Sequence, residues 1–416
     1  MSKRTIFHVD VNSAYLSWEA IDRLEKGYEL DLRTVPSIVG GDEEKRHGIV
    51  LAKSIPAKKY GISTGETLFM AKRKCPFLKT VPPNYTLYTR CSEEMVRVLE
   101  EYSPLIQQYS IDEMFLDYTN MEKHFGEEIT AAHEIKERIK KELGFTVNIG
   151  IGPNKLLAKM ASELKKPDRV HTIYPDEIAD KMWPLDTKEL LMVGSRTREK
   201  LANRGIKTIG ELARSKPYYL ERFLKSHGIL IWNYANGIEN SPVRREGLPM
   251  KGLGNSSTLP FDVKDMDTAK KILLSLTETV SMRLRKSKKS AGLVSIKLKN
   301  SSFLSYSHQK KLEVPTDSTK KVYHHAKELL KEAWQKEPIR HMGIHLSDLC
   351  SNELHQLTIF SYNNEKESKM DNAIDKLRQK YGHEVLIRSC FLHSGLDPML
   401  GGVIKEKDYP MMSSLL

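Results

Sequence analysis

Residues 109–117 read YSIDEMFLD, which places two adjacent acids, Asp112 and Glu113, inside an otherwise apolar strand pattern. Burying an unpaired carboxylate is costly, so such groups are normally protonated, paired with a base or bound to a metal. Neighbouring side chains of a continuous strand point to opposite faces, so both acids can serve one ligand only if the chain turns or bulges there. We therefore predict a tight hairpin near Ile111 and Asp112, with residues 114–116 as the returning strand. A solvated turn is the alternative.

A third acid interrupts an apolar strand pattern near the N-terminus, where TIFHVDVNSAY contains Asp10. If the two strands meet in one sheet, Asp10, Asp112 and Glu113 come together. Three carboxylates around one point repel one another unless divalent cations neutralise them, and hard oxygen ligands suit Mg²⁺. Two such ions, about 3.5 to 4 Å apart, would stabilise the attacking and leaving oxygens of a phosphoryl transfer. From spacing alone, solvated turns remain open.

Length and composition narrow the class of protein. A chain of 416 residues is expected to form roughly two to four domains. No run of about 18 apolar residues is present and the N-terminal stretch does not resemble a secretory signal, so we expect a cytoplasmic protein that does not bind membranes. The four cysteines are scattered without a CxxC pair, which argues against a zinc ribbon or a disulfide framework. A formal net charge of +12 favours a polyanionic partner such as nucleic acid.

The order of patterns along the chain predicts an α+β fold, because strands and helices alternate without a regular βαβ repeat. Residues 185–240 instead suggest a compact helical domain of short helices broken by glycines. The segment 241–252 contains two Pro and two Gly and reads as a linker. Beyond it, residues 267–284 and 319–334 have apolar residues at helical spacing, while 293–299 alternate. This pattern predicts a sheet backed by two helices.

Basic residues concentrate between Arg283 and Lys299, a segment with seven Lys or Arg and no acid. Lys297 and Lys299 lie on the outward face of the predicted strand, and Arg285 precedes it. A solvated charged face is the alternative. A strand with a purely basic open face, just past a flexible linker, favours a surface that tracks nucleic-acid phosphates.

Five segments, in order along the chain, resemble the motifs of the Y-family (translesion) DNA polymerases of bacteria. The first three motifs are matched by HVDVNSAYLSWEA, YSIDEMFLD and NIGIGPNKLLAKMASELKKPDR. MVGSRTREKLANRGIKTIGELA resembles the helix-hairpin-helix of the family, and KGLGNSSTLP resembles the entry to its little-finger domain. The specificity belongs to the ordered set, which extends over nearly the whole chain.

The resemblance implies a right-hand polymerase with a palm, small fingers, a helical thumb and a C-terminal little-finger α/β sandwich. The expected activity is template-directed addition of deoxynucleotides to a primer 3′ end, with low fidelity, without proofreading, and in bypass of lesions. Primer-template DNA and deoxynucleoside triphosphates are the expected partners of a monomeric enzyme. The implied boundaries are 1–16 and 77–170 for the palm, 17–76 for the fingers, 171–240 for the thumb, 241–252 for the linker, 253–350 for the little finger and 351–416 for a tail.

The resemblance also implies roles for the acidic residues. Asp10, Asp112 and Glu113 would hold two catalytic Mg²⁺ ions, and the backbone carbonyl of Val11 would be a further ligand. Tyr15, the aromatic five residues past the first Asp, would lie against the incoming sugar and exclude a ribose 2′-hydroxyl. A packed aromatic of the strand-to-helix turn is the alternative for Tyr15.

The nucleotide site departs from the family pattern. SIPAKKYG aligns with a triphosphate-binding stretch in which Tyr-x-x-Arg is common, but Ile55 and Lys58 occupy those two positions here. Lys58 can neutralise a phosphate oxygen but lacks the bidentate fork of Arg. We expect Ser54 to replace part of the missing hydroxyl function. Lys166, just before Pro167, matches the second triphosphate lysine of the family.

Two pairs of residues in the third motif have less specific interpretations. Lys155 and Lys159 are one helical turn apart, which favours a solvated helix face or template contacts. Gly150 and Gly152 could let the backbone approach a phosphate, although a lone GxG is a weak signal.

The resemblance implies two further binding sites. In the helix-hairpin-helix, Gly194 would permit a hairpin whose amides bind a DNA phosphate, with Arg196 beside it. A helical packing turn is the alternative. QLTIF, with Gln356, Leu357 and Phe360, resembles the pentapeptide by which bacterial polymerases bind the sliding clamp, and the alternative is a final strand of the preceding sheet.

Two other functions compete with polymerisation. A polymerase-shaped accessory protein would bind DNA and the clamp without catalysis, but such relatives are expected to lose the carboxylates, and this chain keeps all three. A two-metal nuclease with a helix-hairpin-helix would leave Tyr15 and the two triphosphate lysines without a role.

Overall fold

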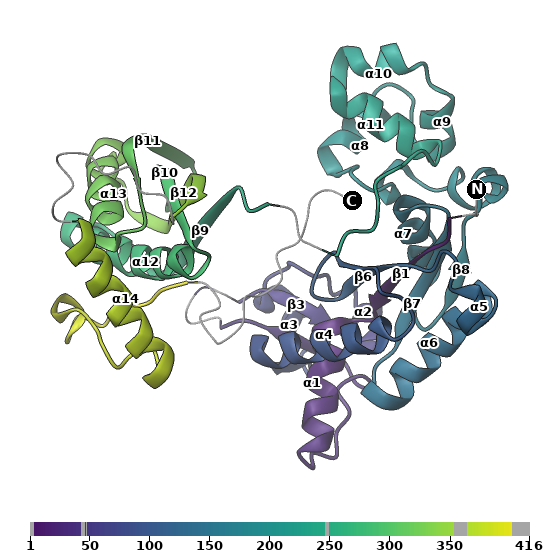
Figure 1. Ribbon diagram of the computed structural model, residues 1–416, viewed down its shortest axis with the longest axis horizontal. Helices are drawn as coiled ribbons and strands as arrows, with labels where there is room; N and C mark the ends of the chain where they lie inside the picture. Colours follow the sequence, from purple (N-terminus) through teal and green to yellow (C-terminus); the bar gives the residue numbers. More distant parts are fainter. Residues whose placement is uncertain (1–3, 43–45, 47, 246–248, 353–363, 402–416) are drawn as a thin grey trace. The chain divides into compact units, whose positions relative to one another are not determined.

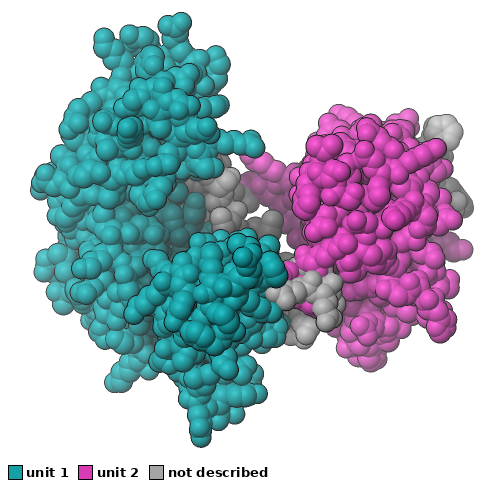
Figure 2. All heavy atoms as spheres, turned by 180° about the vertical axis from the view of Figure 1, so that it is seen from behind, with its two compact units in different colours: residues 1–40, 50–248, 409–416 teal, residues 41–49, 249–408 magenta. Residues whose placement is uncertain are grey.

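The computed structural model describes residues 4–42, 46, 48–245, 249–352 and 364–401 (Figure 1). The chain forms two compact units, unit 1 with residues 1–40, 50–248 and 409–416 and unit 2 with residues 41–49 and 249–408 (Figure 2). The division at residue 248 falls within the segment predicted as a linker. Over the described ranges, no helix is both long enough and apolar enough to cross a membrane.

Unit 1 contains a five-stranded sheet with the spatial order β5-β6-β1-β7-β8. The central strand β1 pairs antiparallel with both β6 and β7, and all six of its residues are buried. A strand that is covered on both faces explains why the apolar pattern around Asp10 is nearly continuous. The strands are β1 (Ile6–Val11), β5 (Ile106–Gln108), β6 (Glu113–Asp117), β7 (Val147–Gly152) and β8 (Val170–Thr172).

Different helices cover the two faces of this sheet (Figure 1). Phe7 and Val9 of β1 belong to a hydrophobic core shared with α4 (Tyr85–Glu100) and α6 (Glu128–Leu143). Alternate residues of a strand point to opposite faces, so His8 and Asp10 face the other way. His8 Nδ1 lies 2.8 Å from the hydroxyl of Ser162 in α7 (Lys155–Glu163), which covers that second face.

Helix α7 packs very closely against the sheet. It begins at Asn154, whose side chain accepts a hydrogen bond of 2.9 Å from the backbone N–H of Leu157 and so caps the helix. A Cβ on Gly150 would lie only 1.9 Å from the carbonyl oxygen of Ala158, and one on Gly152 would lie 2.8 Å from the Ala158 nitrogen. These glycines therefore serve strand-to-helix packing, which corrects the interpretation that they let the backbone approach a phosphate.

A small module follows β1 along the chain. Its three-stranded sheet has the order β3-β2-β4 and encloses a small hydrophobic core that includes Ile38, Val50 and Leu68. Both short helices of the module begin at a residue whose hydroxyl accepts a backbone N–H. The elements are α1 (Ala14–Glu25), β2 (Ser37–Gly40), β3 (Val50–Lys53), α2 (Ile55–Lys59), α3 (Leu68–Lys74) and β4 (Lys79–Val81).

The rest of unit 1 is mainly helical. The prediction of short helices in residues 185–240 is confirmed, and their apolar residues form a separate core that also includes Leu156 and Leu157 of α7. The elements are α5 (Glu122–Phe125), the 3₁₀ helix η1 (Pro175–Glu177), the π-helix η2 (Ile178–Met182), the 3₁₀ helix η3 (Thr187–Glu189), α8 (Ser195–Ala202), α9 (Ile209–Arg214), α10 (Pro217–Leu224) and α11 (Ser226–Ala235).

Unit 2 is an antiparallel four-stranded sheet with the order β11-β10-β12-β9. Val294, Ile296 and Leu298 of β10 are buried in a core shared with α12 and α13, so the predicted sheet backed by two helices is confirmed. The elements are β9 (Gly252–Val263), α12 (Met266–Lys286), β10 (Lys289–Asn300), β11 (Ser305–Thr316), α13 (Thr319–Ala333), β12 (Ile339–Ser351), α14 (Asn364–Tyr381) and the 3₁₀ helix η4 (Ser389–Phe391).

Within unit 2, buried ion pairs hold α14 against α12. The guanidinium of Arg285 donates to both carboxylate oxygens of Asp375, at 2.6 and 2.9 Å, and to Asp371 at 3.3 Å. Arg378 donates to Glu278 at 2.6 Å. The Arg285 side chain is only 6% exposed. The prediction that Arg285 contacts DNA is therefore wrong, because its charge is consumed by partners that lie about 90 residues away in sequence.

The close approach of β7 and α7 yields a test of stability. Gly150→Ala should destabilise the protein by about 3 kcal/mol, because overpacking a core against backbone atoms forces the backbone to shift. Urea denaturation monitored by circular dichroism measures this loss. An effect below about 0.5 kcal/mol, the range of neutral surface substitutions, would contradict the packing described for this strand.

Candidate active site

The stretch YSIDEMFLD forms the predicted hairpin. Strands β5 and β6 pair antiparallel, and the carbonyl of Glu113 accepts the backbone N–H groups of Tyr109 and Ser110 at 2.9 and 3.1 Å. The chain therefore turns through Ser110, Ile111 and Asp112, and Glu113 begins the returning strand. Asp112 thus lies in the turn and Glu113 is the first residue of β6. Both acids lie where the strands end, so their side chains can face a site instead of the core.

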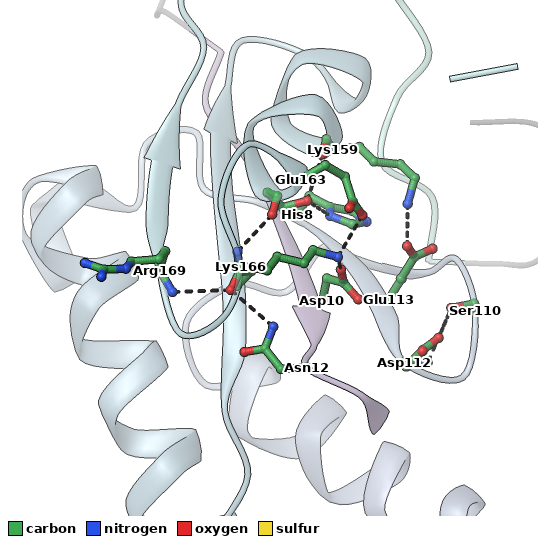
Figure 3. Close-up of polar contacts among 12 residues, drawn as sticks. His8, Asp10, Asn12, Ser110, Asp112, Glu113, Lys159, Glu163, Lys166 and Arg169 are labelled. Carbon is green, nitrogen blue, oxygen red and sulfur yellow. Dashed lines mark hydrogen bonds and ion pairs between the residues drawn. The ribbon is translucent and has the colours of Figure 1, made fainter. Parts of the chain in front are cut away.

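The register of the sheet brings two of the predicted acids together. Asp10 of β1 is the direct cross-strand partner of Glu113 in β6, so their side chains lie on one face. Glu163, at the end of α7, joins them, and one carboxylate oxygen of each residue lies within 4.8 Å of those of the other two (Figure 3). Glu163 was not singled out in the sequence. Its position four residues after Lys159 places both residues on one face of α7, and Lys166 follows just beyond the end of that helix.

Asp112 stands apart from this group. Its carboxylate accepts a hydrogen bond of 2.6 Å from the hydroxyl of Ser110, within the turn (Figure 3). Its backbone carbonyl accepts the N–H of Val11 at 3.1 Å, so the turn is tied to the strand that carries Asp10. The expected meeting of three carboxylates thus holds for Asp10 and Glu113, whereas the Asp112 side chain faces Ser110.

Two lysines neutralise the acidic group (Figure 3). Lys159 Nζ is paired with Glu113, and Lys166 Nζ is paired both with Asp10 and, at 2.9 Å, with Glu163. The side chain of Lys159 is only 12% exposed. Lys155 is fully buried and donates to Gln107 at 3.1 Å. The interpretation of Lys155 and Lys159 as a solvated helix face is therefore wrong.

Burial controls the electrostatics of this group. It raises the pKa of Asp10 to about 7; the Lys166 ammonium opposes this increase and the Glu113 carboxylate adds to it. Burial lowers the pKa of Lys166, but the carboxylates of Asp10 and Glu163 outweigh it and hold that pKa above its usual value. The pKa of His8 is well below its usual range because of burial and the two nearby lysines. His8 is therefore a neutral packing and hydrogen-bonding group.

The donor set fits a divalent cation. Asp10, Glu113 and Glu163 are all carboxylates, which are the hard oxygen ligands that Mg²⁺ prefers. Two lysines pair with these three acids, so the ammonium groups balance only part of the negative charge that a cation would neutralise.

Tyr15 lies in a cluster of aromatic rings at the start of α1. Its ring stacks on Tyr88 with centroids 4.3 Å apart and planes inclined by 7°, and it contacts Trp18 at 6.0 Å. Tyr15 is half-buried. Packing therefore fixes the ring, and a fixed ring is also what a steric filter needs, so the two interpretations of Tyr15 are compatible.

Ser54 has a structural role that corrects its prediction as a nucleotide ligand. A hydroxyl offers one donor and two acceptor positions. The Ser54 hydroxyl donates to the carbonyl of Val35 at 2.8 Å and accepts the N–H groups of Ser37 and Ala57, both at 3.1 Å. All its capacity is thus used, and the residue is 2% exposed. Lys58, on the same short helix, is exposed.

The predicted DNA contacts other than Arg285 are accessible. Arg196 and Lys297 are exposed, and Lys299 is partly so. Gly194 is the residue before α8 and has φ −80°, a backbone conformation that any residue can adopt. The segment QLTIF lies outside the described residues.

Comparison with known proteins places the chain in a family. A family model described as the impB/mucB/samB family matches residues 9–163, and the model of its C-terminal domain matches residues 250–359. A DNA polymerase IV of Clostridium acetobutylicum is 48% identical over 393 residues, which cover 94% of this chain and 99% of the relative. DNA polymerase IV 1 of Bacillus subtilis is 36% identical over 393 residues, covering 94% of this chain and 93% of the relative.

A solved structure shares the fold. A Y-family DNA polymerase chimera aligns with a TM-score of 0.73 at 23% identity, covering 84% of this chain and all of that chain. The chain therefore belongs to the impB/mucB/samB family of Y-family DNA polymerases. The resemblance of its motifs is confirmed, and so is the α+β right-hand fold.

The raised pKa of Asp10 predicts a pH-dependent effect of Asp10→Asn in the presence of a chelator. A carboxyl with a folded-state pKa of about 7 binds more protons in the folded than in the unfolded protein, so its contribution to stability falls as pH rises from about 4 to 7. The change in stability caused by Asp10→Asn should therefore be more favourable at pH 8 than at pH 5. Urea midpoints of both proteins at the two pH values measure this, and an equal difference at both would contradict the assignment.

Proposed function

We propose that this chain is a translesion DNA polymerase that adds deoxynucleotides to a primer 3′ end by two-metal phosphoryl transfer. The observation that carries the proposal is the cross-strand pairing of Asp10 with Glu113 at the end of a sheet, with Lys159 and Lys166 against them. The family membership and the DNA polymerase IV relatives support the same activity.

Asp10 and Glu113 would hold two Mg²⁺ ions together with Asp112 and the carbonyl of Val11. When bound, these ions supply the charge that lowers the cost of deprotonating the primer hydroxyl and of releasing pyrophosphate. The recruitment of Asp112 would require its carboxylate to leave the Ser110 hydroxyl. Positioning and charge neutralisation then account for most of the catalysis.

Three other side chains would act on the incoming nucleotide. Lys166 and the exposed Lys58 would neutralise the triphosphate as point charges, without the bidentate geometry of Arg. Tyr15, held by its stacking on Tyr88, would present a rigid ring against the sugar. A rigid aromatic wall excludes an added hydroxyl by steric overlap, so it would select deoxyribonucleotides.

The division of labour along the chain follows the family. The proposed regions are the palm (1–16 and 77–170), the fingers (17–76), the thumb (171–240), the linker (241–252), the little finger (253–350) and the tail (351–416). Arg196, Lys297 and Lys299 would contact the phosphates of primer-template DNA, and the accessibility of these side chains supports this role. Gln356, Leu357 and Phe360 would bind the sliding clamp. Low fidelity, lesion bypass and the lack of proofreading are proposed from the family.

Primer extension tests the metal ligands. Glu113→Ala and Asp112→Ala should each reduce extension at least about a hundredfold, because each removes a ligand of the cations whose charge stabilises the transition state, while binding of primer-template DNA persists. Glu122→Ala, which removes an exposed acid beyond the hairpin, is the matched control and should leave extension unchanged. Full activity of the Glu113 variant would refute the proposed site.

The sugar filter has its own test. Tyr15→Ala should increase incorporation of ribonucleotides relative to deoxyribonucleotides about tenfold or more, because the pocket loses the ring that overlaps the 2′-hydroxyl; a single pocket contact is worth about that much. Tyr15→Phe keeps the ring and its packing and should leave discrimination unchanged. Single-nucleotide extension assays measure both, and equal discrimination in the Ala variant would leave Tyr15 with a packing role alone.

A further inference from the structure

The acidic group and its lysines form a matched set of charges. Glu113 has Lys159 as its partner, whereas Asp10 shares Lys166 with Glu163. Both lysines come from the segment around α7, and both carboxylates at the sheet come from β1 and β6 (Figure 3). Each acid proposed to hold a metal, apart from Asp112 in its turn, therefore has an ammonium group assigned to it by the fold.

Burial of the acids distinguishes these pairs from incidental surface contacts. The side chains of Asp10, Lys159 and Glu113 are 7%, 12% and 18% exposed, and Lys166, at 35%, is the more accessible base. Leaving one member of such a pair without a partner costs several kcal/mol. The lysines therefore satisfy the carboxylates while no cation is present. A cation that coordinates the same carboxylates brings its own charge to them, so the ammonium groups have to give way.

We propose that Lys159 and Lys166 are built-in counter-ions of Glu113 and Asp10, and that both lysines leave these acids when a cation binds. Glu163 is then a positioning residue, which keeps Lys166 beside the site after this exchange. The proposal rests on the proposed metal site. It assigns Lys159 and Glu163 roles that the sequence did not indicate.

Each lysine has a second contact that can hold it after the exchange. Lys166 retains Glu163, three residues earlier on the same segment, and this pair is the more exposed part of the group, with side chains 35% and 45% exposed. Lys159 Nζ lies 5.2 Å from the centre of the Tyr109 ring, a cation–π distance. Both ammonium groups would thus stay beside the site, where an arriving triphosphate adds negative charge.

The first experiment measures Mn²⁺ binding to the protein without DNA or nucleotide, from the loss of the electron paramagnetic resonance signal of the free ion. Lys159→Met and Lys166→Met should each bind Mn²⁺ more tightly, by roughly 3- to 100-fold, the range of coupling between contacting groups. Lys165→Met removes the adjacent exposed lysine and is the matched control, expected to bind as the unchanged protein does. Unchanged or weaker binding by both Lys159 and Lys166 variants would overturn the exchange.

Asp10→Asn separates this proposal from the one on which it rests. If the Asp10→Asn variant binds Mn²⁺ as tightly as the unchanged protein, the proposed metal site itself is wrong. If Asp10→Asn loses binding but the lysine variants do not gain it, the site stands and the exchange fails. Circular dichroism melting of every variant shows that a change in binding is not a loss of fold, and two lysine variants keep the test open if one of them fails to fold.

A double-mutant cycle tests the role of Glu163. When Lys166 is present, Glu163→Gln should weaken Mn²⁺ binding about threefold or more. Without the Glu163 carboxylate, Lys166 keeps only Asp10 as an acidic partner and leaves it less readily for a cation. In the Lys166→Met background the same substitution should have no effect. An equal loss in both backgrounds would make Glu163 a metal ligand instead, and no loss in either would leave it without a positioning role.

Discussion

The pairing of Asp10 with Glu113 across β1 and β6 is the constraint on which the site depends. Side chains in a sheet alternate with a period of two, so a register slip of one residue would turn Asp10 toward the core that contains Phe7 and Val9. The second requirement is the close approach of α7, which Gly150 permits by having no Cβ opposite the Ala158 carbonyl. Together they place acids from the sheet against bases from the helix.

Both units contain buried ion pairs, but with different bases. In unit 2 the guanidinium of Arg285 donates to both carboxylate oxygens of Asp375. This bidentate geometry holds α14 in one position. At the acidic group the bases are lysines, whose ammonium is a point charge on a flexible stem. A bidentate guanidinium–carboxylate pair suits a permanent contact, whereas a single ammonium group can be displaced from a carboxylate by a cation. The choice of base thus matches a structural role in unit 2 and the role that we propose for the lysines in unit 1.

The sequence predicted the features that local pattern determines and missed those that depend on a distant partner. Adjacent acids within an apolar stretch indicated the hairpin, and strand alternation indicated the buried face of β10. Arg285 and Lys159 were read as solvated or phosphate-binding, because a charge in a sequence does not reveal the acid that it meets in the fold. Ser54 was misread for the same reason, since its three hydrogen-bond partners lie on both sides of it along the chain.

The most direct test of the account is a crystal structure of the protein with primer-template DNA, a non-hydrolysable deoxynucleoside triphosphate and Mn²⁺, with the ions located by their anomalous scattering. The account predicts Mn²⁺ peaks within coordination distance, about 2.0 to 2.2 Å, of carboxylate oxygens of both Asp10 and Glu113, with the ammonium of Lys159 no longer on Glu113. Nucleotide bound in a site whose Mn²⁺ ions lie away from these two residues would contradict it.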